Sequence, residues 1–342
     1  MKILHISLHS YLYKYGGIEK NVTNLLDLPY QYKVDHLIIS KSFSKVPFKI
    51  NKSKIFVQKK KSYLNIFLSI IHFFKIYKEY DIIHFHHTRA IILLLLSFTF
   101  HKKIISTIHA NVVDYFKGYK IFNIINLFIL FKSKKVILTN KNILDNKIYI
   151  KFNKKISIIY HGEKKNKKIK ILNKNYLLCI ARGGADYKNY EFLNNLKSLP
   201  LDLYIIGMNR TDTERLNYCK NIKYLFNIKD EIKEIIISNC TALVSFSNTP
   251  LETFNITLIE GFKYHKPAIT FQGSLASNIV NENMKTGLVL NNQKKNFIKA
   301  INDLRHNKKL YNSLSNGAYK KFIEKFQLKN TNRKYIDLIK SL

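Results

Sequence analysis

The sequence predicts an α/β protein with two doubly wound domains, each built on a parallel sheet. Apolar runs of strand length alternate with segments of helix length through most of the 342 residues, a pattern typical of parallel sheets covered by helices. Within these runs successive residues are apolar, as in strands buried on both faces. The runs form two sets separated by residues 163–168, a polar and charged segment that predicts a linker.

The elements follow the chain in order. The first set of predicted strands lies at residues 2–8, 34–40, 54–58, 81–86, 103–109, 135–139 and 156–160, and the second set at 176–181, 203–206, 222–226, 242–246, 268–271 and 287–290. Helices are predicted at residues 17–26, 63–78 and 255–264, and from 292 to the end.

These elements predict a first domain at residues 1–163 and a second at 164–315. Residues 316–342 form a helical segment that we expect to pack back on the first domain. Two such domains would face each other across a cleft. Ligands of doubly wound sheets bind at the carboxyl ends of the strands, so residues directly after strands are the candidates for function.

The chain is strongly basic, with 58 Lys+Arg against 22 Asp+Glu and a formal net charge of +36. Such a charge attracts polyanions, both nucleic acids and acidic lipids. The lysines are scattered, and the sequence has no helix-turn-helix, zinc-finger or RNA-recognition signature. We therefore rank an acidic membrane above specific nucleic acid, although A+T-rich codons would produce part of this charge with no selected partner.

Cysteine usage and hydropathy predict the compartment. Cys179, Cys219 and Cys240 have no metal-ligand spacing, and an odd count without a disulfide framework fits a reducing environment. No secretory signal opens the sequence. The longest apolar run, residues 90–100, is well short of the roughly 20 residues of a spanning helix. We expect a cytoplasmic protein that contacts the inner face of the cytoplasmic membrane.

Two glutamates with seven residues between them follow the predicted strand at 242–246. If a helix begins near Asn255, Glu252 lies in the loop before it and Glu260 lies inside it. Eight residues of helical rise are about 12 Å, close to the span from a sugar across a diphosphate to a ribose. The amides of the helix start would lie between them and bind phosphate. The alternative is a surface helix with two ordinary glutamates.

A pair of cationic residues follows another predicted strand. Arg182 ends the strand, and Lys188 lies six residues on, past Gly183 and Gly184, at the start of a predicted helix. A forked guanidinium and an ammonium that converge on one point suit a diphosphate. The alternative for Lys188 is a solvated side chain, since lysine is abundant in this sequence.

Paired glycines, Gly16 and Gly17, come after the first strand and open a predicted helix. Glycines let a ligand approach the backbone, and a helix start can bind an anion. A plain tight turn is the alternative.

Histidines gather at strand ends: His84, His86 and His87 after one strand, and His109 after the next. Only His84 and His86 would share a face of their strand. No carboxylate pair and no Asp-x-Asp motif accompanies them, so we expect no zinc site. His109 is the better candidate for a contact with a sugar hydroxyl, with a structural histidine as the alternative.

Together these motifs resemble, in the same order, those of family-4 glycosyltransferases. These are retaining enzymes with the GT-B fold, of the kind that assembles bacterial lipopolysaccharide, O-antigen or capsule. The resemblance covers most of the chain, and its segments are residues 16–19, 81–86, 106–109, 158–162, 182–188, 203–207, 252–260 and 266–269. It departs where Thr253 and Asn255 replace frequent glycines, where Gly261 replaces alanine, and where His161 precedes Gly162 in place of asparagine.

The resemblance implies a role for each matching residue. Glu252 would contact the transferred sugar, and Glu260 would bind the ribose hydroxyls. The implied catalytic residues are His109, Arg182, Lys188 and Glu252. The implied donor-binding residues are Gly16, Gly17, Arg182, Lys188, Thr253, Phe254, Asn255, Ile256 and Glu260. Residues 1–163 would be the acceptor-side domain and 164–315 the nucleotide-sugar domain.

The implied reaction transfers a hexose or related sugar, with retention, from a UDP-sugar or GDP-sugar to a glycan or polyprenyl-diphosphate-linked acceptor. Arg182, Lys188 and a helix start would neutralise the departing nucleoside diphosphate, so no metal and no cofactor is expected. No nucleophilic carboxylate is identified, which favours attack by the acceptor on the same face of the sugar.

The acceptor-side domain contains two helical segments, residues 59–75 and 117–135, in which lysines flank Phe- and Ile-rich sequence. Such segments suit the surface of an acidic membrane, although both could simply cover the sheet. Two other functions stay open at this point. One is a nucleotide-sugar epimerase or hydrolase on the same fold, and the other is a basic nucleic-acid-binding protein.

Overall fold

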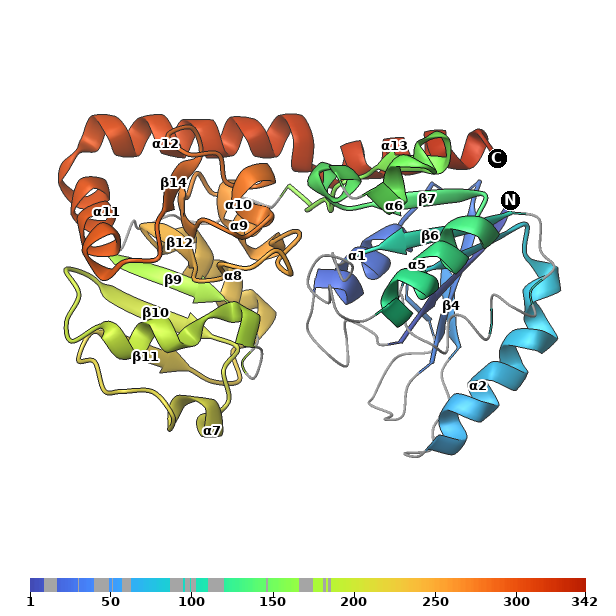
Figure 1. The fold of residues 1–342 in the computed structure, drawn as a ribbon, viewed down its shortest axis with the longest axis horizontal. Helices are drawn as coiled ribbons and strands as arrows, with labels where there is room; N and C mark the ends of the chain where they lie inside the picture. The colour runs from blue at the N-terminus through green and yellow to red at the C-terminus, as the bar shows by residue number, and fades with distance from the viewer. Residues whose placement is uncertain are drawn as a thin grey trace. The chain divides into compact units, whose positions relative to one another are not determined.

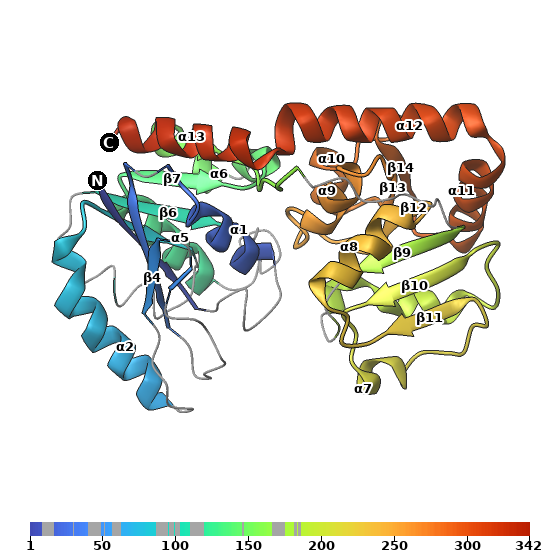
Figure 2. The ribbon, with the colours of Figure 1, turned by 180° about the vertical axis from the view of Figure 1, so that it is seen from behind.

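The computed structural model describes residues 1–8, 17–29, 31–39, 49–50, 52–56, 63–86, 95, 99, 103–109, 120–145, 147–165, 175–180, 183 and 186–342. The chain divides into two compact units. The N-terminal unit comprises Met1–Gly162 and Leu328–Leu342, and the C-terminal unit comprises Glu163–Gln327. Each unit is a sheet with helices on both faces (Figures 1 and 2).

The sheet of the N-terminal unit has the strand order β3-β4-β2-β1-β5-β6-β7-β8. All neighbours in it are parallel except β3 and β4. The strands are β1 (Lys2–Ser7), β2 (Lys33–Ile38), β3 (Lys49–Ile50), β4 (Ser53–Phe56), β5 (Ile82–Phe85), β6 (Ile104–Ile108), β7 (Lys135–Leu138) and β8 (Ile156–Ile158). The chain moves outward from β1 in one direction and from β5 in the other, so the strand order reverses between β1 and β5.

Two layers of helices cover this sheet. Helices α2 (Tyr63–Ile76) and α5 (Lys120–Lys132) cover one face, where Phe73 and Ile129 pack with the strand residue Leu4. Helices α1 (Gly17–Leu25) and α13 (Leu328–Lys340) cover the other face, where Tyr335 packs with Ile3. Successive residues of a strand point to opposite faces, so Ile3 and Leu4 of β1 contribute to different cores.

The sheet of the C-terminal unit is parallel throughout and has the order β11-β10-β9-β12-β13-β14. Its strands are β9 (Tyr176–Ile180), β10 (Asp202–Ile206), β11 (Ile222–Leu225), β12 (Ala242–Ser245), β13 (Ala268–Phe271) and β14 (Gly287–Leu290). This is the doubly wound order of dinucleotide-binding sheets, with its topological switch point between β9 and β12.

The helices of the C-terminal unit are α7 (Arg210–Thr213), α8 (Asp230–Asn239), α9 (Ile256–Phe262), α10 (Ala276–Ile279), α11 (Lys294–His306) and α12 (Lys308–Lys321). Beneath them four phenylalanines, Phe192, Phe246, Phe271 and Phe297, interlock in the core with ring centroids between 4.9 and 6.1 Å apart. Cys179, Cys219 and Cys240 are free, buried thiols. They pack as small apolar side chains in this unit.

The chain crosses between the units at two neighbouring points. After α12 a single π turn, Phe322–Phe326, leads to Gln327, which forms a β-bridge with Glu163. Helix α13 then begins at Leu328 and joins the N-terminal unit. The sequence set these boundaries at 163 and 316. The second boundary lies further along the chain, after Gln327, because α12 continues through Asn316 and Gly317 and the π turn follows it directly.

Two parallel-sheet α/β units confirm the predicted fold class. One local prediction is wrong, because no α-helix begins at Lys188. Two 3-10 turns, Asp186–Lys188 and Tyr190–Asn195, stand there instead. Asn189 between them has a φ of 54°, and this left-handed conformation interrupts right-handed helical hydrogen bonding. Shorter elements in the N-terminal unit are the 3-10 turns Tyr77–Glu79, Lys141–Asp145 and Asn153–Lys155 and the helix α6 (Lys147–Ile150).

Within the residues that the structure describes, no helix is both long enough and apolar enough to cross a bilayer. Helix α2, the longest of the described helices of the N-terminal unit, has 14 residues, against the roughly 20 that spanning requires.

Candidate functional site

Lys188 and Glu252 meet at the switch point of the C-terminal sheet. Lys188 follows β9 and Glu252 follows β12, and these two strands are hydrogen-bonded neighbours, with Cys179 opposite Val244. The ammonium of Lys188 forms an ion pair with Oε2 of Glu252. The sequence predicted both residues separately, from different motifs, and the fold brings them into contact where doubly wound sheets bind their ligands.

This ion pair is nearly enclosed. The side chains of Lys188 and Glu252 are 14% and 8% exposed, and the Lys188 ammonium lies 5.0 Å from the centre of the Tyr187 ring. Burial by itself disfavours the charged ammonium, but the Glu252 carboxylate outweighs it and raises the pKa of Lys188. The site therefore holds a permanent cation with little competing water, which is the environment that strengthens its pull on an anion.

The loop that carries Glu252 is braced from the neighbouring loop after β13. The backbone carbonyl of Glu252 accepts hydrogen bonds from the amide of Ala276 at 2.9 Å and from Ser274 Oγ at 3.3 Å. Gly273 has a φ of 93° and comes so close to the Asn248 carbonyl that a Cβ there would overlap it. Two loops thus hold the carboxylate of Glu252 in place beside Lys188.

Asn255 caps helix α9 and fastens it to the sheet. Its side-chain oxygen accepts a hydrogen bond from the Thr257 amide at 3.1 Å, and its side-chain nitrogen donates to Ser245 Oγ at the end of β12. Thr253, Phe254 and Ile256, predicted to line the donor site, are buried beside it. Asparagine therefore fixes the helix start where the family often has glycine, and one amide of the first turn is already satisfied.

Glu260 lies inside α9, as predicted, but it is not an open carboxylate. It is 2% exposed, and its Oε1 lies 3.5 Å from the ammonium of Lys233 on α8. Lys233 also lies 3.6 Å from Asp230 one turn earlier. Lys233 was not predicted from the sequence, although Asp230 and Lys233 have the i,i+3 spacing of a helical ion pair.

A second departure from the family also has a physical reason. A Cβ at Gly261 would overlap the side chain of Leu243 on β12. Glycine therefore lets α9 pack closely on the strand that leads to Glu252. Alanine, frequent at this position in the family, would need Leu243 to change its conformation.

In the N-terminal unit His109 is held between two other imidazoles. It follows β6 and is 8% exposed. Its ring stacks on His161 with centroids 5.3 Å apart and parallel planes, and on His86 at 5.7 Å. Burial lowers the pKa of His161 to about 3, so this neighbour is neutral. His161, which stands where the family has asparagine, was noted as a departure but not predicted to contact His109.

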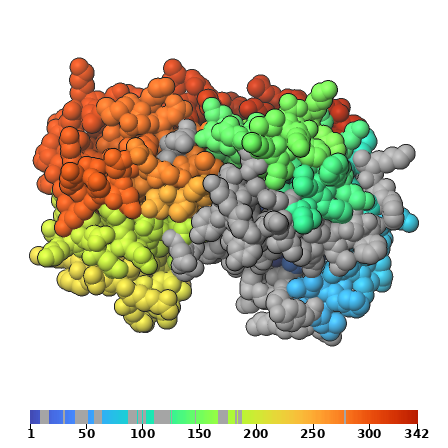
Figure 3. Space-filling view, in the orientation of Figure 1, coloured from blue at the N-terminus to red at the C-terminus, as the bar shows by residue number. Residues whose placement is uncertain are grey.

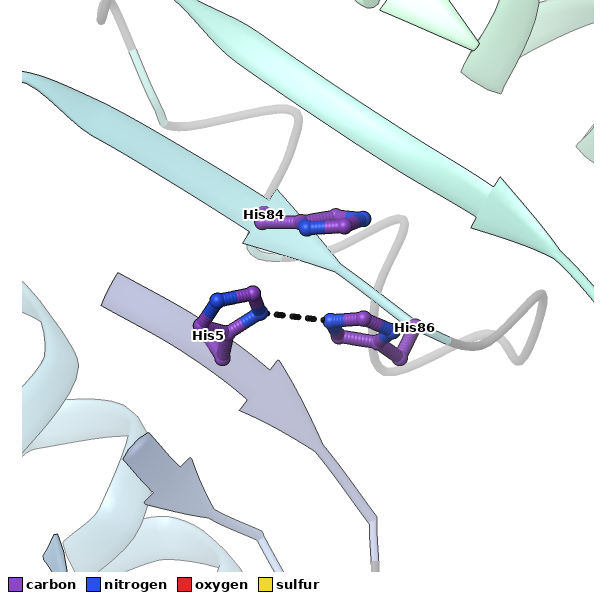
Figure 4. Close-up of side chains that lie close together, drawn as sticks. All are labelled: His5, His84 and His86. Carbon is purple, nitrogen blue, oxygen red and sulfur yellow. Dashed lines mark hydrogen bonds between the residues drawn. The ribbon is translucent and has the colours of Figure 1, made fainter. Parts of the chain in front are cut away.

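Further into this unit, His5, His84 and His86 form a buried cluster (Figure 4). His5 Nδ1 and His86 Nε2 are 2.7 Å apart and share a hydrogen bond. The two nitrogens of His84 bond to Tyr335 of α13 at 2.8 Å and to Thr107 at 2.7 Å. His84 and His86 lie side by side as the strand periodicity predicted, whereas His5 and Tyr335 were missed because they come from remote segments.

For several predicted site residues the described part of the chain does not test the predicted role. Gly16 and Arg182 lie outside the described residues, as does His87. Gly17 is the first residue of α1. The roles of Gly16, Gly17 and Arg182 at the donor phosphates and of His109 at the donor sugar stay predictions.

Residues 161–321 match the model of a known protein family, described as glycosyl transferases group 1. The C-terminal unit belongs to the group 1 glycosyl transferases. The predicted family resemblance is thereby confirmed. Lys188, Glu252 and Glu260 all lie within this group 1 domain.

Individual relatives agree with the group 1 assignment. O-antigen chain mannosyltransferase C of Escherichia coli is 26% identical over 123 residues. That match spans 36% of this chain and about a third, 33%, of the length of the mannosyltransferase.

Solved structures share the fold of the whole chain. The Anabaena protein Alr3699/HepE, crystallised with UDP-glucose, has a TM-score of 0.79 at 15% identity, and all of both chains is covered. The lipopolysaccharide outer core galactosyltransferase WaaB has a TM-score of 0.67 at 16% identity, covering 100% of this chain and 99% of WaaB. These likenesses confirm the GT-B fold class.

Proposed function

We propose that the protein transfers a hexose or related sugar from a nucleotide-diphosphate sugar, UDP-linked or GDP-linked, to a glycan or lipid-linked acceptor. The observation that carries the proposal is the Lys188–Glu252 pair at the switch point of a group 1 domain. Such a position suits a nucleotide ligand. Two similar proteins support a sugar-nucleotide donor. The Anabaena protein, which is similar in fold, was crystallised with UDP-glucose, and the Escherichia coli protein is named a mannosyltransferase.

The chemistry follows from where negative charge develops. When the bond from the anomeric carbon to the phosphate oxygen breaks, the electron pair stays on that oxygen and the nucleoside diphosphate gains negative charge. The Lys188 ammonium, with the predicted partner Arg182, would stabilise that charge more in the transition state than in the bound donor. Because the cations are supplied by the chain, we propose that transfer needs no metal.

Binding of the donor would also change what Glu252 does. In the ligand-free protein its carboxylate neutralises Lys188. A diphosphate would compete for the same ammonium and release Glu252 to accept hydrogen bonds from hydroxyls of the sugar. Glu252 would thus neutralise the buried ammonium of Lys188 until the donor binds.

Retention of the anomeric configuration is part of the proposal and comes from the family resemblance. We propose that the acceptor hydroxyl attacks on the face from which the diphosphate departs. In that arrangement the leaving phosphate oxygen takes the proton of the acceptor, so no protein nucleophile is required.

A membrane-bound acceptor is suggested by exposed apolar side chains of the N-terminal unit. On α2 the exposed Leu64, Phe67 and Ile71 are spaced at i, i+3 and i+7 and therefore share one side of the helix. On α5 Ile124 and Phe131 are 63% and 68% exposed. Both helices contribute surface to the N-terminal unit in the space-filling view (Figure 3).

Charge near these side chains favours an acidic membrane as the partner. Lys75 and Lys78 follow the apolar side chains of α2, and Lys132 and Lys134 follow Phe131, all four exposed. Apolar side chains that enter the interface, flanked by lysines, bind anionic bilayers. We propose that the protein binds the inner face of the cytoplasmic membrane as a peripheral protein and acts in lipopolysaccharide, O-antigen or capsule synthesis.

The donor proposal is tested by thermal shift and by transfer of labelled sugar. UDP, GDP and their sugars are each added with and without a chelator. One diphosphate should raise the melting temperature, unchanged by the chelator, and its labelled sugar should appear on a polyprenyl-linked acceptor. Lys188→Met should lose the response, and Lys197→Met, at an exposed lysine of the same unit, should keep it. A response that survives in Lys188→Met would contradict the site.

The membrane proposal is tested by sedimentation with vesicles. We expect binding to vesicles containing phosphatidylglycerol, weak binding to pure phosphatidylcholine, and loss in the double variant Phe67→Ser/Phe131→Ser. Phe226→Ser, at an exposed phenylalanine of the C-terminal unit, is the matched control. Equal binding by the double variant and the control would exclude this surface as the contact.

A further inference from the structure

The cluster of His5, His84 and His86 takes no part in the proposed transfer. His5 lies on β1 directly opposite His84 on β5, and His86 follows the end of β5. One ligand nitrogen from each ring lies within 4.8 Å of the others, and all three side chains are fully buried (Figure 4). Two adjacent strands thus direct three imidazoles to one point.

The surroundings of these rings suit coordination. All three side chains are fully buried, which disfavours the charged imidazolium. A neutral imidazole offers a free lone pair, the form in which histidine binds metal ions.

The spacing is close to that of a tetrahedral site. Zinc–nitrogen bonds of about 2.0–2.1 Å at tetrahedral angles separate ligand nitrogens by roughly 3.3–3.4 Å. His5 Nδ1 and His86 Nε2 are 2.7 Å apart, and the ring centroids of His5 lie 4.9 and 5.0 Å from those of His84 and His86. Ring movements on the order of 1 Å would place all three around one ion.

The hydrogen bonds of His84 supply the outer part of such a site. Its Nε2 lies 2.7 Å from Thr107 Oγ1, so that partner can fix the ring while Nδ1 binds the ion. Tyr335 has its hydroxyl 2.8 Å from the same Nδ1. Because that oxygen contacts the His84 nitrogen, it could supply a fourth ligand.

The contact between His5 and His86 uses only part of what the two rings can offer. A single hydrogen bond joins His5 Nδ1 and His86 Nε2, so only one of these two nitrogens offers its lone pair. An ion between the rings would engage the lone pairs of both nitrogens. The opposite nitrogens, His5 Nε2 and His86 Nδ1, have no hydrogen-bond partner among the described residues, and they would then both carry an N–H.

The sequence led us to expect no zinc site at these histidines, because His5 was not seen to join them. We now propose that His5, His84 and His86, with the hydroxyl oxygen of Tyr335, form a buried site for a first-row transition-metal ion such as Zn²⁺. No described cysteine, aspartate or glutamate joins the group, which disfavours Mg²⁺ and Ca²⁺. Because Tyr335 belongs to α13, the ion would fasten the C-terminal helix to the sheet of the N-terminal unit. The site is separate from Lys188 and Glu252, and its role is structural.

The test uses the untagged full-length protein, freed of metal with a chelator and then dialysed. Titration with ZnCl₂ should show one tight site per chain and raise the melting temperature. Co²⁺ should give the visible absorption bands of a tetrahedral ion. His5→Gln and His86→Gln should weaken binding by roughly 100-fold or more. His306→Gln, at an exposed histidine of α11, should bind as the wild type does.

A conservative variant guards against a failure to fold. Tyr335→Phe keeps the aromatic ring in the core and removes only the oxygen, so it should still bind Co²⁺ but with an altered spectrum. Absence of a tight site in the wild type, or tight binding that persists in His5→Gln, would overturn the proposal. The response to UDP or GDP through Lys188 is measured separately, so failure of one proposal leaves the other standing.

Discussion

The two units share a doubly wound parallel strand order, in which β4-β2-β1-β5 corresponds to β11-β10-β9-β12, but they place different chemistry at the point where that order reverses. In the C-terminal unit that point, between β9 and β12, holds the charged pair Lys188 and Glu252. In the N-terminal unit it lies between β1 and β5 and holds the neutral imidazoles of His5 and His84. A fold fixes where a ligand can bind, whereas the residues at the switch point decide what kind of ligand.

The difference in charge also predicts a difference in behaviour. A buried ion pair is neutral as a pair and exposes a net charge only when one partner is taken by a ligand. Buried neutral histidines carry no charge until acid or a metal ion supplies one. The C-terminal unit should therefore respond to phosphate, and the N-terminal unit should respond to protons and transition metals.

The largest expected effect comes from removing the charge of Lys188 in the C-terminal unit while keeping a side chain of similar length. Lys188→Met should lower kcat by about 10²–10³-fold, because an electrostatic group at the leaving diphosphate is lost. It should also destabilise the unit, since Glu252 is left buried without its cation. The measurements are the initial rate of sugar transfer and urea unfolding.

The double variant Lys188→Met/Glu252→Gln sharpens that result. It should recover much of the lost stability, because no unpaired charge is buried, and recover none of the activity. Recovery of both together would mean that Lys188 acts only on stability.

The next effect is the pH dependence of the N-terminal unit. The pKa of His161 is about 3 in the folded protein against about 6.5 when unfolded. Between these values the unfolded chain binds more protons, so the stability from neutral His161 is complete above pH 6.5 and falls as the pH is lowered toward 3. From pH 7 to pH 5 this residue should cost about 2 kcal/mol of unfolding free energy.

Urea unfolding at pH 7 and pH 5 gives the unfolding free energy that each protein loses on acidification. The contribution of His161 is the difference between the losses of wild type and His161→Asn. The asparagine variant should lose less stability on acidification, and His306→Asn, at an exposed histidine, should behave as the wild type. Identical losses in wild type and His161→Asn would show that His161 titrates normally.

The smallest effect concerns the second glutamate. Glu260→Gln should weaken nucleotide binding by roughly tenfold, or about 1.4 kcal/mol, because an amide is a poorer acceptor for ribose hydroxyls than a carboxylate. Glu234→Gln is the matched control. It breaks the ion pair of Glu234, on α8, with Lys263, the residue after α9, at 3.0 Å. Calorimetry should show no change in affinity.

Much of the fold and part of the candidate site could be predicted from the sequence. Apolar strand runs and intervening helices predicted both sheets, and the Glu252-to-Glu260 spacing predicted the loop and helix at the second switch point. Local patterns succeed there because each motif lies within a few residues of its own strand. The α-helix predicted at Lys188 is replaced by 3-10 turns. The reason is that Asn189 adopts a left-handed conformation, which no periodicity of the sequence reveals.

The contacts between remote segments could not be predicted. His5 reaches His86 across 81 residues of sequence, and Tyr335 reaches His84 across 251. Lys233 meets Glu260 only because α8 and α9 pack side by side. A single sequence gives the face of an element that is buried, but not the element that lies against it.

The most direct measurement for the central claim is the structure of the protein with its nucleoside diphosphate bound. We expect an oxygen of the diphosphate to lie about 2.7–3.2 Å from Nζ of Lys188. The Glu252 carboxylate should have left that ammonium, and the ribose hydroxyls should contact Glu260. A nucleotide bound elsewhere, with the Lys188–Glu252 pair unchanged, would contradict it.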